Sequence, residues 1–160
     1  MTSSAEVVAR LEELQDQEAA AGMARYGITA SCVYGVRIPV LRRMAKELGT
    51  SHELALDLWE VPCRETRILA GLVGDPERMS PALMLAWAKD FDSWEVCDQV
   101  VMNLFDRTRY NYQLAVQWST QRAGGSAEAF SARASSVAAW FSSIFRLPIF
   151  LSAQLTAFPT

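Results

Sequence analysis

Residues that begin and end helices recur along this chain at short intervals, and they constrain its fold more than any other feature. Ser3-x-x-Glu6 has the form of a capping box, which predicts a helix over residues 4–21. Pro39 suits the first turn of a further helix, which stops at Gly49. No segment shows the strict alternation of apolar and polar side chains that a half-buried strand requires. The sequence therefore predicts an all-α fold.

The same signals predict the rest of the helices and an internal repeat. These helices run from Thr50 to about Trp59, over 63–73, from Ser80 to Lys89, over 94–106 (capped by Asp92 or Ser93) and over 110–120. Trp59-Glu60-Val61 and Trp94-Glu95-Val96 each lie at a helix junction, as a repeated unit would place them. Capped helices with a period of about 35–45 residues are typical of stacked helical hairpins, which leave a concave surface for a long ligand. We therefore expect one helical-repeat domain over residues 1–160 with a large binding partner.

Composition excludes several classes of protein. The chain is 51% hydrophobic and 21% charged over 160 residues, which is a globular and not a disordered composition. No apolar run approaches the ~18 residues that cross a bilayer, and the N-terminus lacks the blocks of a signal peptide. His52 is the single histidine, and P-loop and GxGxxG motifs are absent. We expect no metal site and no cofactor, and we place His52 at the surface.

The number of cysteines and the distribution of charged residues indicate the cellular compartment and the kind of binding partner. Cys32, Cys63 and Cys97 are odd in number and lack metal-binding spacing, so we expect reduced thiols in a cytoplasmic protein. A net charge of −3 and a pI near 5.2 argue against a nucleic-acid binder on charge alone. Clusters of basic residues nevertheless leave a local basic face open, and they comprise Arg37, Arg42, Arg43 and Lys46, then Arg64 and Arg67, then Arg107 and Arg109.

Residues 92–101 carry the most informative pattern. Trp94 and Asp98 are four residues apart and share a helical face, which Val101 and Phe105 continue. A carboxylate in an apolar stripe is costly unless it is exposed in a cleft, paired with a cation or needed for chemistry. Two interpretations stay open: Asp98 is a functional carboxylate, or an arginine from the next helix neutralises it while Trp94 fills the core.

Four segments between about residues 20 and 120 are more specific together than any one of them alone. They are Tyr34-Gly35-Val36-Arg37-Ile38-Pro39-Val40-Leu41-Arg42, Leu58-Trp59-Glu60, Arg64-Glu65-Thr66-Arg67-Ile68-Leu69-Ala70 and Asp92-Ser93-Trp94-Glu95-Val96-Cys97-Asp98. The combination resembles the DNA alkylation repair family of alkylpurine DNA glycosylases, which are built from HEAT-like helical repeats.

The resemblance implies an enzyme that binds duplex DNA and excises cationic alkylated purines, such as 3-methyladenine and 7-methylguanine, without metal or organic cofactor. Because these lesions are already positively charged, little activation of the leaving group is required; a carboxylate near the developing sugar cation stabilises it and positions water, and an indole π face favours the cationic species. By motif, Asp98 and Trp94 take these two roles. Arginines on a concave face would hold phosphates, and the candidates are Arg42, Arg43, Arg64 and Arg67.

Some of these expectations have a structural alternative. Glu65 and Arg67 match a family motif, and we interpret them first as partners of neighbouring helices. Trp59, Trp87 and Trp118 are expected in the core, and Cys97 has no expected role.

For the whole chain, the alternative to a glycosylase is a non-catalytic HEAT-like module that binds DNA or a protein. In either case we expect a monomer without membrane contact.

The C-terminal part departs from the family pattern. Family members carry an arginine in a segment resembling Lys-Arg-Ala-Gly-Phe, which has no clean match here. After Glu128 the chain has no acidic residue, and Arg133 and Arg146 are its only charged side chains. We therefore divide it into a family-like part, residues 1–125, and an atypical segment, residues 126–160.

A shifted reading frame from about residue 131 onward would explain this departure. Loss of one nucleotide from codons for Phe-Lys-Arg-Ala-Gly-Phe yields Phe-Ser-Ala-Arg-Ala-Ser, which are the residues at 130–135.

Overall fold

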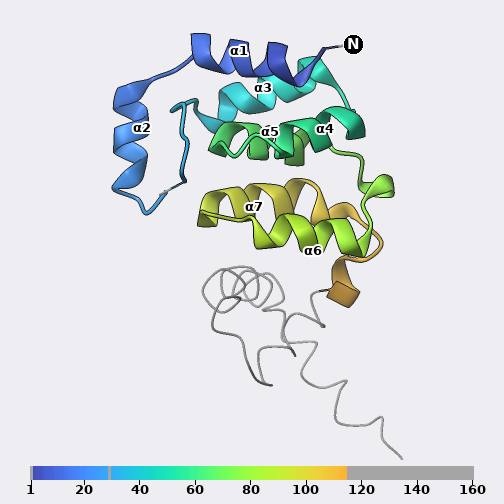
Figure 1. Ribbon diagram of the computed structural model, residues 1–160. Coiled ribbons are helices and arrows are strands. Elements are labelled where there is room, and N and C mark those ends of the chain that lie inside the picture. The colour runs from blue at the N-terminus through green and yellow to red at the C-terminus, as the bar shows by residue number, and fades with distance from the viewer. Residues whose placement is uncertain (1, 29, 115–160) are drawn as a thin grey trace, which may run out of the picture.

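The computed structural model describes residues 2–28 and 30–114, and all regular structure in them is helical (Figure 1). The α-helices are α1 (Ser4–Glu13), α2 (Gln17–Ala24), α3 (Ile38–Leu48), α4 (His52–Trp59), α5 (Arg64–Val73), α6 (Pro81–Lys89) and α7 (Trp94–Asn103), with 3₁₀ turns at η1 (Pro76–Arg78) and η2 (Phe105–Arg107). The predicted all-α class is confirmed. No described helix is long and apolar enough to cross a membrane.

Several predictions concern residues outside this described part. Trp118, most of the helix expected over 110–120, and the whole of the atypical segment 126–160 fall there. Of the helix expected over 110–120, residues 110–114 are described, and residues 111–114 are helical.

Local capping signals place most helix ends correctly. The Ser3–Glu6 capping box is present, with both side chains accepting backbone N–H groups. Gly49 ends α3 with φ of +71° and ψ of −171°, a backbone conformation that is essentially restricted to glycine. The expected start at Thr50 is wrong by one residue, because the Ser51 side chain accepts the N–H of Leu54 and caps α4.

The single helix expected over residues 4–21 is wrong, since two helices meet at Asp16. The Asp16 N–H donates to the carbonyl of Tyr34 at 2.8 Å, which takes this amide out of a helical ladder. The Asp16 side chain accepts the N–H of Ala19 at 2.8 Å and starts α2. The break thus depends on a contact with a residue far along the chain. Gly35 makes the close approach possible, because a Cβ there would lie 2.0 Å from the Asp16 carbonyl oxygen.

Helix α5 lies at the centre of the described fold and packs against α3, α4 and α7 (Figure 1). Figure 1 shows the α4–α5 and α6–α7 pairs following one another as stacked hairpins. The tripeptide repeat does not mark equivalent positions, however: Trp59 ends α4 and is buried, whereas Trp94 begins α7 and is exposed. The structural match is between the first turns of α5 and α7, where Glu65 and Glu95 each occupy the second helical position.

A cluster of aromatic side chains packs between the α4–α5 hairpin and the α6–α7 hairpin. Trp59 of α4 and Trp87 of α6 stack with ring centroids 4.1 Å apart and an interplanar angle of 1°. Phe91 meets Trp59 edge-on and Phe105 adjoins Trp87. The expected core positions of Trp59 and Trp87 are confirmed.

Candidate active site at the first turn of α7

Trp94 and Asp98 stand one helical turn apart at the start of α7. The Ser93 side chain accepts the N–H of Val96 at 3.3 Å and thereby fixes where this helix begins. The Trp94 side chain is 47% exposed, and its Nε1–H donates to the Tyr26 carbonyl at 3.1 Å. Trp94 is therefore a surface indole held in place by a hydrogen bond, and the interpretation of Trp94 as a core residue is wrong.

Asp98 is half-buried at the edge of the buried face of α7, which consists of Val96, Cys97, Val100 and Val101. Within residues 2–28 and 30–114, no lysine or arginine forms an ion pair with it. Burial raises the pKa of Asp98, and the negative charge of Glu95 raises it further. The arginine that would neutralise Asp98 in the structural interpretation is thus not found in the described part of the chain.

The segment between α2 and α3, residues 25–28 and 30–37, brings a backbone carbonyl to Trp94; we call this segment the α2–α3 loop. Tyr26 is 78% exposed, and its carbonyl receives the Trp94 indole. Gly27 has φ of +75°, and a Cβ there would lie 3.9 Å from Trp94 Nε1. Sequence reasoning missed Tyr26, because no local signal connects two positions that lie 68 residues apart.

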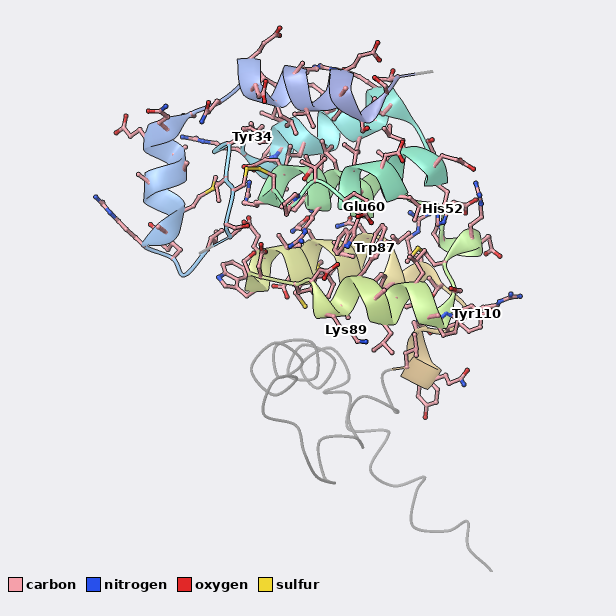
Figure 2. All side chains as sticks on the ribbon, viewed as in Figure 1. Tyr34, His52, Glu60, Trp87, Lys89 and Tyr110 are labelled. Atoms are coloured by element: carbon pink, nitrogen blue, oxygen red, sulfur yellow. A yellow bond between two sulfur atoms is a disulfide. The ribbon has the colours of Figure 1, made fainter. Side chains whose placement is uncertain are left out.

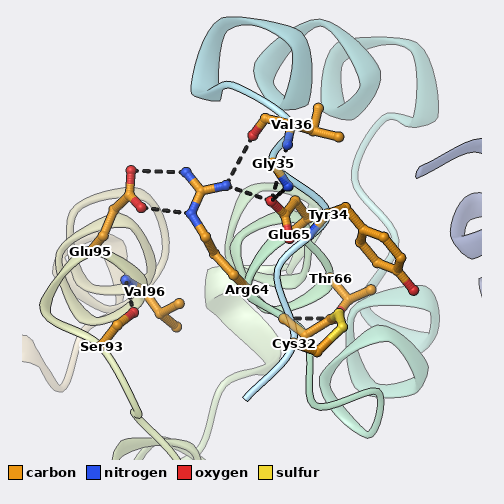
Figure 3. A network of polar contacts seen from close by, with 11 residues as sticks. Cys32, Tyr34, Gly35, Val36, Arg64, Glu65, Thr66, Ser93, Glu95 and Val96 are labelled. Atoms are coloured by element: carbon orange, nitrogen blue, oxygen red, sulfur yellow. Dashed lines mark hydrogen bonds and ion pairs between the residues drawn. A yellow bond between two sulfur atoms is a disulfide. The ribbon is translucent and has the colours of Figure 1, made fainter. Parts of the chain in front are cut away.

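Glu65 fixes the backbone conformation of the Tyr34-Gly35-Val36 motif. Its carboxylate is fully buried and accepts the backbone N–H groups of Tyr34 and Gly35 at 3.0 Å each and of Val36 at 3.2 Å (Figure 3). A buried carboxylate with several such donors is well satisfied. Glu65 therefore holds the end of the α2–α3 loop against the first turn of α5.

Arg64 lies inside the fold, and its predicted role as a phosphate contact is wrong. Nε and Nη2 donate to the two carboxylate oxygens of Glu95 at 2.6 and 2.9 Å, while Nη1 donates to Glu65 at 2.8 Å and to the Val36 carbonyl at 2.9 Å (Figure 3). The side chain is 1% exposed. A guanidinium buried and bonded in this way has no face left for a DNA backbone.

Arg67 is also engaged within the protein. Its Nη1 donates to the Asp90 carbonyl at 2.6 Å and pairs with Asp92 at 3.1 Å, and the guanidinium lies over the Trp59 ring. Only 11% of the side chain is exposed. The structural interpretation of Arg67 is confirmed, and the burial of its side chain argues against the phosphate contact considered for it.

Arg42 and Arg43 remain available cations. Both are exposed on α3, whose buried side chains are Leu41, Met44 and Ala45. No acidic side chain in the described residues forms an ion pair with either arginine.

Two other expectations are corrected. His52, placed at the surface from the sequence, is 5% exposed, and Figure 2 shows it at the far end of the helices from Tyr34. Cys32 and Cys63 form a disulfide, so the expectation of three reduced thiols is wrong for this pair. Cys97 is a free, buried thiol whose pKa burial raises to about 12. The described residues contain no group of three or more potential metal ligands.

Comparison with a solved structure identifies the class of fold. A protein described as "a new family of proteins related to the HEAT-like repeat DNA glycosylases with affinity for branched DNA structures" superposes with a TM-score of 0.71 at 20% sequence identity. The match covers 88% of this chain and 57% of that chain, so the present chain spans little more than half of that protein's length. The fold is HEAT-like, as the sequence predicts.

The family follows from the sequence itself. Residues 7–140 match the family model described as "DNA alkylation repair enzyme", and the chain belongs to this family. This match is longer than the range of about residues 20–120 over which the motifs were recognised. A search among curated proteins found no match.

Proposed function

We propose that this protein binds duplex DNA and excises cationic alkylated purines, such as 3-methyladenine and 7-methylguanine. One observation carries the proposal: the half-buried Asp98 carboxylate, unpaired with any cation among the described residues, stands beside the exposed indole of Trp94. A folded protein tolerates the cost of such a carboxylate where a positively charged ligand or transition state offsets it.

The proposed reaction is a substitution at C1′ of the deoxyribose. The bond between C1′ and the ring nitrogen breaks, and its electron pair leaves with the purine, which thereby loses its positive charge. The sugar carries that charge until a water molecule adds to C1′ and releases a proton. Asp98 stabilises the sugar cation and orients the water, and the Trp94 π face adds to the favourable field. The step needs no metal and no organic cofactor.

Arg42 and Arg43 are the proposed phosphate contacts on α3. Contacts of this kind position a duplex without reading its sequence, and they make affinity depend on salt. Their exposure and their lack of acidic partners among the described residues support this role.

A second candidate is a non-catalytic module that binds branched DNA. It is supported by the description of the superposed HEAT-like protein, which has affinity for such structures. The net charge of −3 also fits a protein with few phosphate contacts better than one that follows a long duplex.

Release of free methylated bases from methylated duplex DNA distinguishes the two candidates. We expect the full chain to release 7-methylguanine, and Asp98→Asn to lower the rate by about 100-fold or more. Duplex affinity should change by less than about 1 kcal/mol, because the lost charge acts on the transition state. Asp57→Asn, at an exposed position on α4, is the matched control and should keep the wild-type rate.

Two outcomes would decide against the glycosylase. Equal rates for Asp98→Asn and the wild type would remove Asp98 from the reaction. A wild-type chain that releases no base, yet binds a four-way junction more tightly than a linear duplex, would establish the second candidate in its place.

A further inference from the structure

The disulfide between Cys32 and Cys63 joins the α2–α3 loop to the start of α5. Cys63 is the N-cap residue of α5 and is buried, whereas Cys32 lies in the loop and is half-buried. The bond spans 31 residues of sequence and has a Cα–Cα distance of 4.5 Å. In Figure 2 it lies next to Tyr34, on the same side of the molecule as the α2–α3 loop.

Non-covalent contacts surround the disulfide and fix the loop on its C-terminal side. The Arg64 N–H donates to the Cys32 carbonyl at 2.9 Å, and Ser31 Oγ donates to the Pro62 carbonyl at 3.3 Å. Glu65 holds the amides of residues 34–36. The half of the loop that precedes Ser31 reaches α7 through the hydrogen bond from Trp94 to Tyr26. Cys32 therefore attaches the α2–α3 loop covalently to α5 at the point where its fixed C-terminal half meets the half that contacts Trp94.

We propose that Cys32 and Cys63 are a reversible thiol–disulfide site, and that its redox state controls how firmly the loop holds Trp94. The reductant is a dithiol of the thioredoxin or dithiothreitol class. In the oxidised state the loop is tethered and Tyr26 keeps the indole in place. In the reduced state residues 25–28 and 30–31 lose their covalent anchor, and the contact between Tyr26 and Trp94 opens more often.

The exchange balances in electrons and atoms. A thiolate of the reductant attacks Cys32 Sγ, the more accessible sulfur, so the S–S bond breaks and Cys63 leaves as a thiolate that takes up a proton. The second thiol of the reductant then attacks the reductant's own sulfur in the mixed disulfide and releases Cys32. Two electrons and two protons pass from the dithiol, which ends as a disulfide. Cys97 takes no part, because burial raises its pKa to about 12 and keeps it as a thiol.

Counting thiols in the full chain tests the first half of the proposal. After treatment with oxidised glutathione, alkylation in denaturant should label one of the 3 cysteines, and after dithiothreitol it should label all 3. Labelling of all cysteines in the oxidised sample would overturn the proposal.

Limited trypsin digestion tests the second half, because Arg25 is exposed at the C-terminal end of α2 and directly precedes Tyr26. We expect cleavage after Arg25 to be at least about threefold faster in the reduced chain and in oxidant-treated Cys32→Ser than in the oxidised wild type. Cys97→Ala is the matched control and should respond to reduction as the wild type does. Equal cleavage rates in the oxidised and reduced wild type would overturn the coupling to the loop.

This test does not depend on the variant or on repair activity. If Cys32→Ser fails to fold by circular dichroism, cycling the wild type between oxidised glutathione and dithiothreitol gives the same comparison. Since neither thiol counting nor digestion involves DNA, the redox proposal and the proposed glycosylase activity succeed or fail separately.

Discussion

Arg64 and Glu95 join the first turns of adjacent helices α5 and α7 through two N–H···O bonds, one to each carboxylate oxygen. Since Glu95 follows Trp94 directly, this bidentate pair fixes the end of α7 that presents the candidate site. The same guanidinium also contacts Glu65 and the Val36 carbonyl, so one buried charge connects α7, α5 and the chain entering α3 (Figure 3).

Replacing Arg64 should therefore be among the most destabilising single changes in the described fold. Arg64→Met leaves the Glu65 and Glu95 carboxylates without their cation, and we expect a loss of about 3–5 kcal/mol in the free energy of unfolding. Arg78→Met is the control, because its pair with Glu53 is solvent-exposed and should contribute far less to stability. Urea unfolding followed by circular dichroism measures both, and similar losses for the two variants would contradict this assignment.

Two glycines with positive φ should differ in their tolerance of a methyl group. Gly49→Ala meets no atom within 4 Å, so we expect only the backbone strain of its φ of +71° with ψ of −171°, about 1–3 kcal/mol. Gly35→Ala, at φ of +82°, would also place a Cβ 2.0 Å from the Asp16 carbonyl oxygen and should cost at least about 4 kcal/mol. Thermal unfolding of both variants tests this order. Equal effects would mean that the approach of Gly35 to α2 is looser than described.

Asp98→Asn should stabilise the protein while it slows the proposed base excision. Because burial and Glu95 raise the folded-state pKa of Asp98, the ionised form is penalised on folding. The penalty sets in as pH rises through the interval between the unfolded and folded pKa values, and it is complete above both. We expect the variant to gain less than about 1 kcal/mol at pH 7.5, since the side chain keeps part of its hydration. The gain should shrink towards pH 4, and a variant less stable than the wild type at pH 7.5 would contradict the electrostatic account.

His52 should make stability depend on pH near its ordinary pKa. Burial, followed by the charge of Arg78, lowers the folded-state pKa of His52 below 6.5. The unfolded chain therefore binds the proton first, and stability should fall as pH drops through about 6.5 towards the folded pKa, with a slope of at most about 1.4 kcal/mol per pH unit. As His52 is the single histidine, His52→Asn should remove this slope from urea titrations between pH 5 and 7.5. An unchanged slope in the variant would assign it to other groups.

If Arg42 and Arg43 contact phosphates, the double variant Arg42→Gln/Arg43→Gln should bind duplex DNA with a weaker salt dependence. The slope of log K against log salt concentration should decrease in magnitude by about 2, one for each lost contact. Lys89→Gln, at an exposed cation on α6, serves as the control and should keep the wild-type slope. A double variant with the wild-type slope would exclude α3 as the phosphate-binding face.

The parts of the fold that the sequence predicts are those fixed by neighbouring residues. Caps such as Ser3, Ser80 and Ser93 act within three residues, so they are readable in the linear chain. The break at Asp16 and the burial of Arg64 depend instead on residues 18 and 31 positions away, namely Tyr34 and Glu95. Nothing local separates such an arginine from exposed Arg42, because both occur in similar helical patterns.

Prediction of the candidate site from the sequence is limited in the same way, because part of it depends on residues that are distant in the chain. The spacing of Trp94 and Asp98 places them on one face of a helix, and the structure agrees. Whether that face is buried is decided by the α2–α3 loop and by the packing of α5. Periodicity within one helix does not contain that information.

The stacked indoles of Trp59 and Trp87 also have an optical consequence. The two rings lie in parallel planes with their centroids 4.1 Å apart, which is close enough for their transition dipoles to couple, so the pair should absorb and rotate light as one chromophore. Its signal reports on the joint between α4 and α6, while the solvent-facing indole of Trp94 emits separately at longer wavelength. Within residues 2–28 and 30–114, the tryptophans thus provide one spectroscopic reporter for the integrity of the stacked hairpins and another for the surface on which the proposed chemistry takes place.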